Sequence, residues 1–443
     1  MKAMLLAATI LAASSFAAIA QPAPPGTAPG TAPGTPPGTA NAAQPAVAPP
    51  SNLDRLRGMQ GTGTPMEMES IPQTGRKADQ LRANLASIQM PPGFSIDLYA
   101  IVPDARHMAV GTNAGVVYVG TRKSKVWAVT DRTRARVADE VKVFAPSIAF
   151  RQPNGVCFSK DGQLYVAEHN RVLVFPAAEF FYEGPDVAVD VVAEQLVPKS
   201  EESFNHGART CTIGPDNKLY VSLGQPYNVP PPGKLEMYAR EGIGGIIRMD
   251  RDGKNREVFA TGIRNSVGQD WNPRTNEMWF TDNQVDGMGD DIPPGEINHA
   301  PRAGMNFGFP YYGGGHTRTV EYKNAEPPAN VTFPDVETAP HAADLGMHFY
   351  RGKMFPAQYR GAIFSAQHGS WNRTTPVGAR VMVTTFKPDG SVDKSEPFAF
   401  GWLNDETGEY SGRPVDVAEL ADGSMLVSDD FAGAIYRISY KAR

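Results

Sequence analysis

Residues 204–224, FNHGARTCTIGPDNKLYVSLG, carry the pattern that decides the fold. A short apolar strand (CTI) is followed by a turn containing Pro-Asp-Asn and by a second strand (LYVSL). Asp and Asn tolerate the positive φ angles that tight turns between antiparallel strands require. Strands this short cannot bury an apolar face by themselves, so the unit must pack against others of its kind.

The same unit recurs along the chain. In PNGVCFSKDGQLYVAEHNRVLVF (153–175) and RPVDVAELADGSMLVSDDFAGAIYRISY (413–440) the turn is Asp-Gly. Three further copies, the last one divergent, occupy residues 107–130, 264–283 and 346–370. Six copies spaced tens of residues apart predict an all-β chain folded as a six-bladed β-propeller; a seven- or eight-bladed ring with one unrecognised blade is the alternative. The sequence has no long apolar segment with a period of 3.6 residues, which argues against an α/β fold.

The propeller is expected to occupy residues 91–443. Residues 94–102, FSIDLYAIV, have the apolar character of a strand. Pairing of this strand with the last one, GAIYRISY (433–440), would close the ring and leave no open sheet edge.

The first 90 residues have a different organisation. Residues 1–20 combine a lysine, an apolar run and the ending Ala-Ile-Ala, which predicts a secretory signal peptide. A membrane anchor is the alternative, but the run is short and rich in Ala and Ser. Residues 21–50, built from PGTAPGT repeats, predict a flexible linker, and residues 51–90 predict an irregular segment. We therefore expect a periplasmic or secreted protein that does not span a membrane.

Composition excludes several classes. The 42 Lys and Arg residues against 47 Asp and Glu give a net charge of −5 without a basic run, so nucleic-acid binding is unsupported. No C-x-x-C-H motif for a covalent c-type haem occurs. Cys157 and Cys211 occupy equivalent positions of consecutive repeats. An exported chain leaves a disulfide open, but we favour two buried free thiols because strands of neighbouring blades usually splay beyond disulfide geometry.

His206 is the first candidate for chemistry, because it precedes the strands of its repeat at the expected mouth of a blade. A neutral imidazole takes a proton from a hydroxyl near pH 7. The alternative is a structural histidine that only makes hydrogen bonds.

Three arginines form the second candidate. Arg264, followed by Asn265, opens one repeat, while Arg373 and Arg413 stand near the expected mouths of other blades. Arginine offers a rigid fork of donors that suits carboxylates or a developing oxyanion, and an ordinary surface role is the alternative. Three such cations around one channel would require an anion, and an aromatic polycarboxylate cofactor would fit, with Trp371 stacked on it.

The segment TDNQVDGMGDDIPPGEIN (281–298) is the third candidate. Closely spaced carboxylates repel one another unless a cation neutralises them, and oxygen ligands of irregular spacing suit Ca²⁺ rather than zinc. A solvated acidic loop is the alternative. The carboxylates are Asp282, Asp286, Asp290, Asp291 and Glu296.

These segments, in this order, resemble the PQQ-dependent sugar dehydrogenases, in particular the L-sorbosone dehydrogenase-like branch related to soluble glucose dehydrogenase. The resemblance covers residues 91–440 and is strongest in TGIRN (261–265), FTDNQVDGMGDDIPPGEIN (280–298), MNFGFPYYGGG (305–315) and QHGSWNR (367–373). It implies a six-bladed propeller with PQQ at the channel mouth and Ca²⁺ bridging PQQ to the protein.

The resemblance also implies residue roles. His206 would be the general base, and Arg264 with Asn265 would contact the quinone oxygens. The remaining cofactor contacts it implies are Gln152, Arg413 and, in place of a family lysine, Arg373. Ca²⁺ would bind backbone carbonyls near Gln284 and Val285, with Asp290, Asp291 and Glu296 as further candidates from the acidic segment. Three departures from the family pattern are Asn205, Val415 and Gln284, which stand where an acid, a second arginine and a glycine are usual.

The expected function is therefore oxidation of an aldose or related sugar or sugar aldehyde by hydride transfer to PQQ. Without a haem motif, electrons would pass to an external quinone or cytochrome. Two alternatives stay open: a Ca²⁺-dependent, lactonase-like propeller hydrolase and a non-catalytic propeller that binds sugars or protein partners. The first two departures leave the identity of the sugar open.

Overall fold

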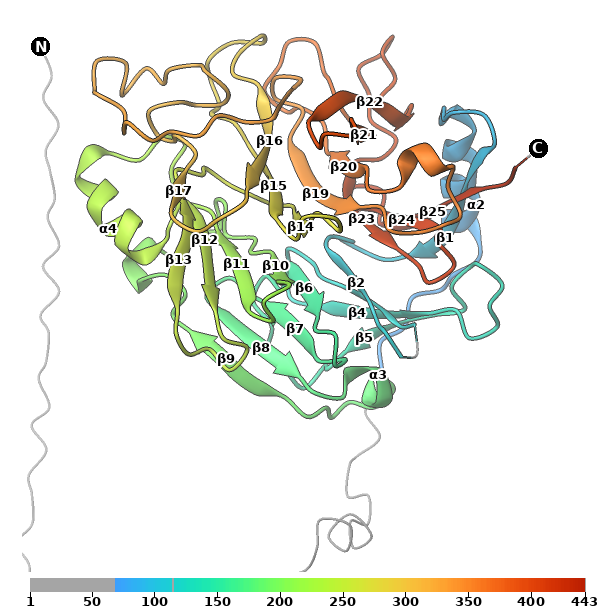
Figure 1. Cartoon of the computed structure of the whole chain (residues 1–443). Coiled ribbons are helices and arrows are strands. Elements are labelled where there is room, and N and C mark those ends of the chain that lie inside the picture. The colour runs from blue at the N-terminus through green and yellow to red at the C-terminus, as the bar shows by residue number, and fades with distance from the viewer. Residues whose placement is uncertain (1–67, 114, 443) are drawn as a thin grey trace, which may run out of the picture. The chain divides into compact units, whose positions relative to one another are not determined.

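The computed structural model describes residues 68–113 and 115–442. These residues form six antiparallel-based sheets arranged in a ring, so the predicted six-bladed β-propeller is confirmed (Figure 1). The innermost strands contact one another in the order β2, β6, β10, β14, β19, β23 and back to β2. The predicted signal peptide (1–20), the linker (21–50) and the first part of the 51–90 segment lie outside the described residues.

Each of the first three blades corresponds to one sequence repeat. Blade 1 consists of β2 (Met108–Val110), β3 (Val117–Val119), β4 (Val126–Thr130) and β5 (Glu140–Phe144). Blade 2 consists of β6 (Gly155–Phe158), β7 (Leu164–Ala167), β8 (Arg171–Phe175) and β9 (Asp190–Glu194). Blade 3 consists of β10 (Cys211–Ile213), β11 (Leu219–Leu223), β12 (Gly245–Met249) and β13 (Glu257–Thr261), with the short β17 (Met305–Asn306) added at its edge.

The other three blades complete the ring. Blade 4 consists of β14 (Gln269–Trp271), β15 (Met278–Asp282), β16 (Gly295–Ala300) and β18 (Val336–Thr338). Blade 5 consists of β19 (Asp344–Phe349), β20 (Ile363–Gln367), β21 (Arg380–Phe386) and β22 (Val392–Phe400). Blade 6 consists of β23 (Pro414–Glu419), β24 (Met425–Asp429) and β25 (Ala434–Tyr440), with β1 (Phe94–Ile101) as its outermost strand.

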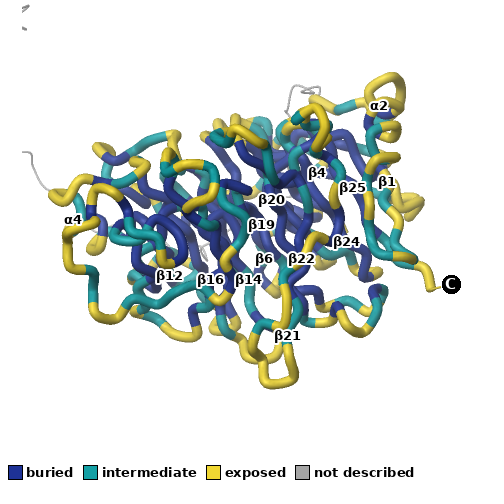
Figure 2. Tube along the Cα trace, turned by 90° about the horizontal axis from the view of Figure 1, so that it is seen from above, coloured by how far each residue is buried: buried dark blue, intermediate teal, exposed yellow. Residues whose placement is uncertain are grey.

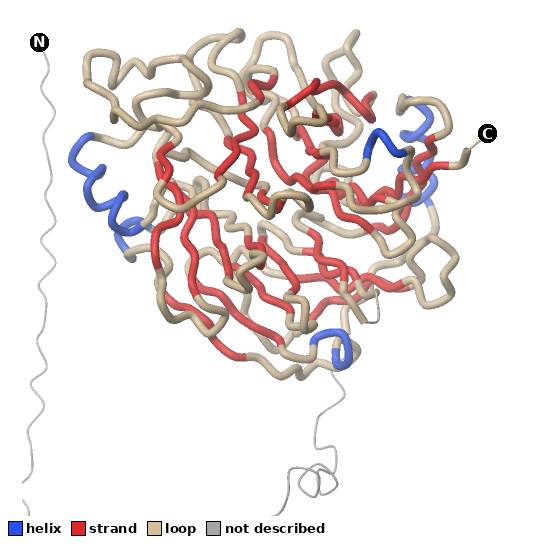
Figure 3. Tube along the Cα trace, viewed as in Figure 1, coloured by secondary structure: helices blue, strands red, loops and turns tan. Residues whose placement is uncertain are grey.

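The ring closes as the sequence predicts. The first and the last strands of the propeller, β1 and β25, pair antiparallel and lie side by side near the C-terminus (Figures 1 and 3). In this pair Phe94 is opposite Tyr440 and Ile101 is opposite Ala434. The sheet of blade 6 is therefore built from both ends of the domain, and the outer edge of β25 is covered.

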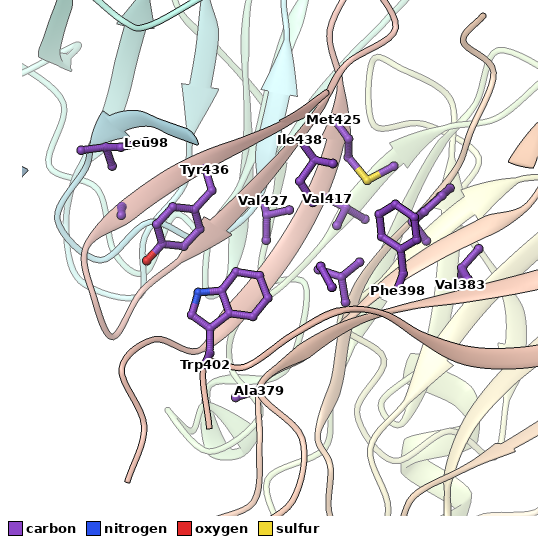
Figure 4. Close-up of a cluster of buried hydrophobic side chains, with 14 of the residues drawn as sticks. Leu98, Ala379, Val383, Phe398, Trp402, Val417, Met425, Val427, Tyr436 and Ile438 are labelled. Atoms are coloured by element: carbon purple, nitrogen blue, oxygen red, sulfur yellow. The ribbon is translucent and has the colours of Figure 1, made fainter. Parts of the chain in front are cut away.

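Apolar side chains fill the spaces between the blades. The buried strands lie inside a rim of exposed loops (Figure 2). One cluster joins blades 5 and 6 through Leu98, Phe398, Trp402, Val427 and Tyr436 (Figure 4). The β-branched and aromatic residues of the second strands, such as LYVSL in β11, are buried on both faces because each sheet is covered on both sides. This packing fixes the inner ends of the strands and hence the loops that follow them.

The segment before the propeller is not irregular throughout, which corrects the expectation for residues 51–90. It contains α2 (Arg76–Asn84), whose Ala78 and Leu81 lie one turn apart and are buried in the cluster of blades 5 and 6. Tertiary packing of this narrow apolar stripe explains a helix that is otherwise polar. The other short helices are η1 (Leu85–Ser87), α3 (Ala178–Phe181), η2 (Lys199–Glu201), η3 (Pro232–Lys234), α4 (Leu235–Glu241) and η4 (Ala357–Tyr359). None of the helices in residues 68–113 and 115–442 has the length and apolar character needed to cross a bilayer.

Cys157 and Cys211 form a disulfide, so the expectation of two free thiols is wrong. They lie in β6 and β10, the innermost strands of blades 2 and 3, with their Cα atoms 5.8 Å apart. Blades splay toward the rim but converge on the central channel, and at this inner radius their separation matches that of a disulfide.

Candidate active site

A cavity of about 220 Å³ lies where loops at one end of the innermost strands meet. Five blades contribute to its lining, and six of the predicted site residues are among the lining side chains. These six are Gln152 from blade 2, His206 from blade 3, Arg264, Asn265 and Gln284 from blade 4, and Trp371 from blade 5. The chain therefore gathers at one place residues that are more than 100 positions apart in the sequence.

His206 has an imidazole whose tautomer is fixed by the backbone. Its Nδ1 lies 2.6 Å from the carbonyl oxygen of Gln225. A carbonyl only accepts hydrogen bonds, so Nδ1 carries the proton and Nε2 keeps a lone pair. Burial, and then the positive charge of Arg264, lower the pKa of His206 to about 3. The side chain is consequently neutral at pH 7 with a lone pair on Nε2, and the same two effects make it a weaker base than a free imidazole.

Arg264 is buried, with only 4% of it exposed, and its guanidinium is held by several hydrogen bonds. Its Nη2 donates to Asp286 Oδ2 at 2.7 Å and to Asn228 Oδ1 at 2.8 Å. Burial lowers its pKa, while the nearby carboxylates of Asp286 and Asp282 oppose that effect. A guanidinium in this setting remains charged and adds a fixed positive potential to the cavity.

Asp282 positions the Arg264–Asn265 pair through the backbone. One carboxylate oxygen accepts the Arg264 N–H at 2.8 Å and the other accepts the Asn265 N–H at 2.7 Å. The two residues therefore enter the cavity from a loop clamped to the end of β15. In the sequence Asp282 was only one of several carboxylates in the acidic segment, and the clamp explains its burial.

His206 and Asn265 lie against the same glycine. A Cβ atom built on Gly224 would lie 2.8 Å from the Cβ of His206 and 2.5 Å from the Oδ1 of Asn265. Only glycine allows the two side chains to come this close. The Oδ1 of Asn265 is buried and has no hydrogen-bond partner among the described residues.

Gln152 and Trp371 reach the same cavity in different ways. Gln152 is buried, with φ of 53°, and its Oε1 lies 3.0 Å from His169 Nδ1. Trp371 lines the cavity too, but it is 75% exposed. Its indole therefore stands at the mouth of the cavity rather than deep inside it.

Arg373 and Arg413 do not line this cavity. Arg413 donates to the carbonyls of His368 and Gly369 and lies over the ring of Tyr410, 4.9 Å from the ring centre. Arg373 donates to the carbonyl oxygens of Asp290 and Thr375. The donors of both guanidinium groups are directed at backbone carbonyls, so of the three arginines expected around the channel mouth only Arg264 reaches the cavity.

The predicted metal ligands separate into two groups. Gln284 and Val285 are buried, and their backbone carbonyls accept no hydrogen bond from the described residues. The carboxylates of the acidic segment do not gather: Asp290 binds Thr374, Asp291 is exposed, and Glu296 is buried against Asn298 and the Gly315 N–H. Across residues 68–113 and 115–442, no three His, Cys, Asp or Glu side chains come together in a way that could hold a metal ion.

Oxygen acceptors are nevertheless abundant at the cavity. The Oε1 of Gln284 and the Oδ1 of Asn372 are buried and lack partners among the described residues, as does the Oδ1 of Asn265. All three residues line the cavity. Buried oxygens without donors are costly, and a hard cation such as Ca²⁺ would satisfy them.

The cavity is also lined by residues that the sequence did not predict as site residues. Arg106 and Arg122 come from blade 1, and His341 precedes β19. His368 lines the cavity as well, and its Nε2 lies 2.7 Å from Asp430 Oδ1. The one available signal was position, because Arg106 and His341 stand before the innermost strands of their blades as His206 does.

The fold and the site together define a six-bladed propeller with a neutral imidazole and a buried guanidinium at one end of its channel. A family model described as glucose/sorbosone dehydrogenase matches residues 187–370, and one described as TrAA12-like matches residues 304–441. A third, described as NHL repeat, matches residues 150–175, which span most of blade 2.

Individual proteins resemble the chain in sequence or in fold. A protein of Borreliella burgdorferi described as uncharacterized is 30% identical over 366 residues, covering 80% of this chain and 92% of that protein. The Trichoderma reesei carbohydrate-active enzyme of family AA12 has a similar fold, with a TM-score of 0.66 at 19% identity over 80% of this chain and 98% of that one. The holo PQQ domain of pyranose dehydrogenase from Coprinopsis cinerea follows with a TM-score of 0.63 at 19% identity over 80% of this chain and 97% of that one. The chain belongs to the glucose/sorbosone dehydrogenase family.

Proposed function

We propose that this protein is a PQQ-dependent dehydrogenase that oxidises an aldose or a related sugar or sugar aldehyde. One observation carries the proposal: His206 Nε2 keeps a free lone pair in the cavity that also holds Arg264 and Asn265. The likeness in fold to a holo PQQ domain supports the choice of cofactor.

His206 would act as the base. Hydride loss from a carbon that bears a hydroxyl is easier when the hydroxyl proton leaves at the same time, and Nε2 is the group placed to take it. The carbonyl of Gln225 holds the other ring nitrogen, so the imidazolium that forms keeps its orientation. When bound, PQQ supplies a quinone that takes up the hydride and its two electrons.

Arg264 and Asn265 would bind the oxygens of the group that is reduced. Arg264 is charged and shielded from water, so its attraction to a developing negative charge is stronger than at the surface. The clamp from Asp282 keeps this donor pair in place before the reaction, which avoids reorganisation during it.

We propose Ca²⁺ as the metal of the same site. The carbonyls of Gln284 and Val285, which accept no hydrogen bond from the described residues, would form an oxygen-only donor set with the Oε1 of Gln284 and the Oδ1 of Asn372. Asp290, Asp291 and Glu296 are not part of that set, because each lies elsewhere or has its own partners.

Export to the periplasm or the medium is part of the proposal. The signal-like residues 1–20 motivate it, and the disulfide between Cys157 and Cys211 suits an oxidising compartment. Electrons would leave the site to an external quinone or cytochrome.

Reconstitution tests the function. Chelator-treated full-length protein is mixed with PQQ, with Ca²⁺ or with both, and reduction of a redox dye is followed with a panel of aldoses. We expect turnover only with both additions. Turnover in the apoprotein, or hydrolysis of a lactone with Ca²⁺ alone, would contradict the proposal.

A further inference from the structure

Arg122 presents a guanidinium at the cavity. It follows β3 in blade 1, lines the cavity and is exposed. Among the described residues its guanidinium makes no hydrogen bond and no ion pair; only its backbone N–H is engaged, by Asp104 Oδ2 at 2.8 Å. A flexible, charged side chain that turns toward a cavity without a partner suggests an anion that binds there.

A second guanidinium lies close by. Arg106 is 4% exposed, and it is held by Asn154 Oδ1 at 2.9 Å and by Asp430 Oδ2 at 2.8 Å. The charge of Arg106 is the largest influence on Arg122, whose pKa it lowers, ahead of burial. Two like charges therefore face one space. Asp430 and Asp104 offset part of the repulsion between them, and an anion bound between the two guanidinium groups would offset more.

The carboxylates around the pair are already engaged. Asp430 accepts from Arg106 and contacts His368, while Asp104 accepts backbone N–H groups of residues 122 and 123. Among the lining side chains, Asp286 is the one carboxylate, and it is paired with Arg264. The lining thus carries three arginines against one acid, and the surplus of positive charge is on blade 1.

The ring order places this pair opposite the reaction site. The innermost strands run from blade 1 to blade 6 in sequence order, so blade 1 lies across the channel from blade 4. Arg264 and Asn265 are on blade 4. A ligand that occupies the cavity with one end at Arg264 would therefore present its other end to Arg106 and Arg122.

We propose that Arg122, backed by Arg106, is a carboxylate-binding subsite across the channel from Arg264. Arg122 supplies a guanidinium fork that can bind the carboxylate directly. Arg106, which is buried, adds a second positive charge. The carboxylate belongs either to PQQ or to an acidic sugar such as a uronate. The cofactor source rests on the proposed function, whereas the acidic-sugar source can be measured without PQQ.

The test compares variants that differ by one charge. Arg122→Gln removes the proposed contact. Lys123→Gln removes the same charge from the next residue, which does not line the cavity. PQQ binding to the full-length apoprotein with Ca²⁺ is measured by quenching of tryptophan fluorescence, and binding of D-galacturonate and D-galactose is measured by calorimetry.

We expect Arg122→Gln to weaken binding of the carboxylate ligand about 10- to 100-fold, as loss of a hydrogen bond to a charged group does. Lys123→Gln should leave it within about twofold. Because the Arg122 guanidinium makes no hydrogen bond or ion pair with the described residues, its replacement should not lower the unfolding temperature of the apoprotein, which separates ligand binding from a structural role.

The outcomes distinguish the sources. Loss of PQQ affinity assigns the subsite to the cofactor, and loss of galacturonate affinity without change for galactose or PQQ assigns it to an acidic sugar. Equal affinities for both ligands in Arg122→Gln and wild type would overturn the inference. A wild type that does not bind PQQ refutes the proposed function instead, and the galacturonate comparison then decides on Arg122 alone; binding of neither ligand refutes both.

Discussion

His206 and Asn265 are packed against one glycine, Gly224, which leaves no space for a Cβ atom between them. The distance between the proposed base and the proposed quinone-binding pair is thus set by a residue that takes no part in chemistry. Even a small displacement of a base from the proton that it removes lowers the reaction rate substantially.

Gly224→Ala should therefore act on catalysis. The new methyl group would displace His206 or Asn265, and we expect kcat to fall at least ~10-fold, with a loss of about 1–3 kcal/mol in the free energy of unfolding. Steady-state dye reduction and urea denaturation measure the two effects. Gly233→Ala, where a Cβ atom meets nothing within 4 Å, is the control. Unchanged kcat in Gly224→Ala would show that the spacing is not critical.

His206→Gln should remove the base and keep the site. We expect kcat to fall by at least ~10², because a general base typically contributes that much, while the dissociation constants of PQQ and Ca²⁺ stay nearly the same. His316→Gln, at an exposed histidine outside the cavity, should keep wild-type kcat. If His206→Gln retains more than about a tenth of wild-type kcat, the assignment fails and His368 becomes the next candidate.

Arg264→Lys should weaken both cofactor binding and rate. Lysine keeps the charge but loses the planar fork that contacts Asn228 and Asp286 together. We expect PQQ affinity and kcat each to fall about 10-fold or more, since a charge-assisted hydrogen bond is lost. Equal PQQ affinity in variant and wild type, measured by fluorescence titration, would argue against contact between Arg264 and the cofactor.

The other end of the channel predicts a pH dependence of stability. His348 lies 3.2 Å from Asp270 and 3.6 Å from Glu419, on strands of three different blades. Burial alone would lower the pKa of His348, but the two carboxylates outweigh it and raise the pKa. A histidine with a raised pKa contributes stability that is fully present below its unfolded pKa of about 6.5 and is lost as pH rises through the folded value.

The free energy of unfolding should accordingly decrease as pH rises above about 6.5, and His348→Gln should lack that part of the decrease. Urea denaturation of both proteins at a series of pH values measures the difference. Parallel pH profiles would mean that the pKa of His348 is not raised in the folded protein.

The disulfide predicts a redox effect on stability. Replacing both Cys157 and Cys211 by serine should lower the free energy of unfolding by about 2–4 kcal/mol, because the unfolded chain loses a cross-link. Wild-type protein denatured in the presence of a reductant should approach the double variant. Identical denaturation curves with and without reductant would show that the bond is absent in solution.

The fold could be predicted from the sequence because a propeller repeats one local pattern. Each blade has its own turn residues and short apolar strands in the sequence. The number of blades and the pairing of β1 with β25 could therefore be predicted from local sequence patterns. The helix α2 was missed, because its apolar stripe is narrow and gains stability only from packing on the propeller.

The residues of the site could be predicted from the sequence only in part. His206, Arg264 and Asn265 stand directly before innermost strands, and the ring brings such positions together whatever their spacing in the sequence. Arg413 occupies a similar place and Arg373 follows β20 of blade 5, but the donors of both are satisfied by carbonyls of neighbouring loops. Whether an arginine reaches the cavity or donates to a nearby carbonyl depends on tertiary contacts. The approach of Cys157 to Cys211 depends on them as well, so no local sequence pattern predicts either.

The pairing of β1 with β25 has a consequence for how the molecule is made. Ser95 and Ser439 lie side by side although 344 positions separate them along the chain. While the chain emerges from a ribosome or a translocation pore, β1 has no neighbour on its inner side until the final strand arrives. Five blades can form in the order of synthesis, but the ring closes only when β25 has been made. A chain that lacks β25 would therefore keep five complete sheets, while β1 would have no strand to pair with and the ring would stay open.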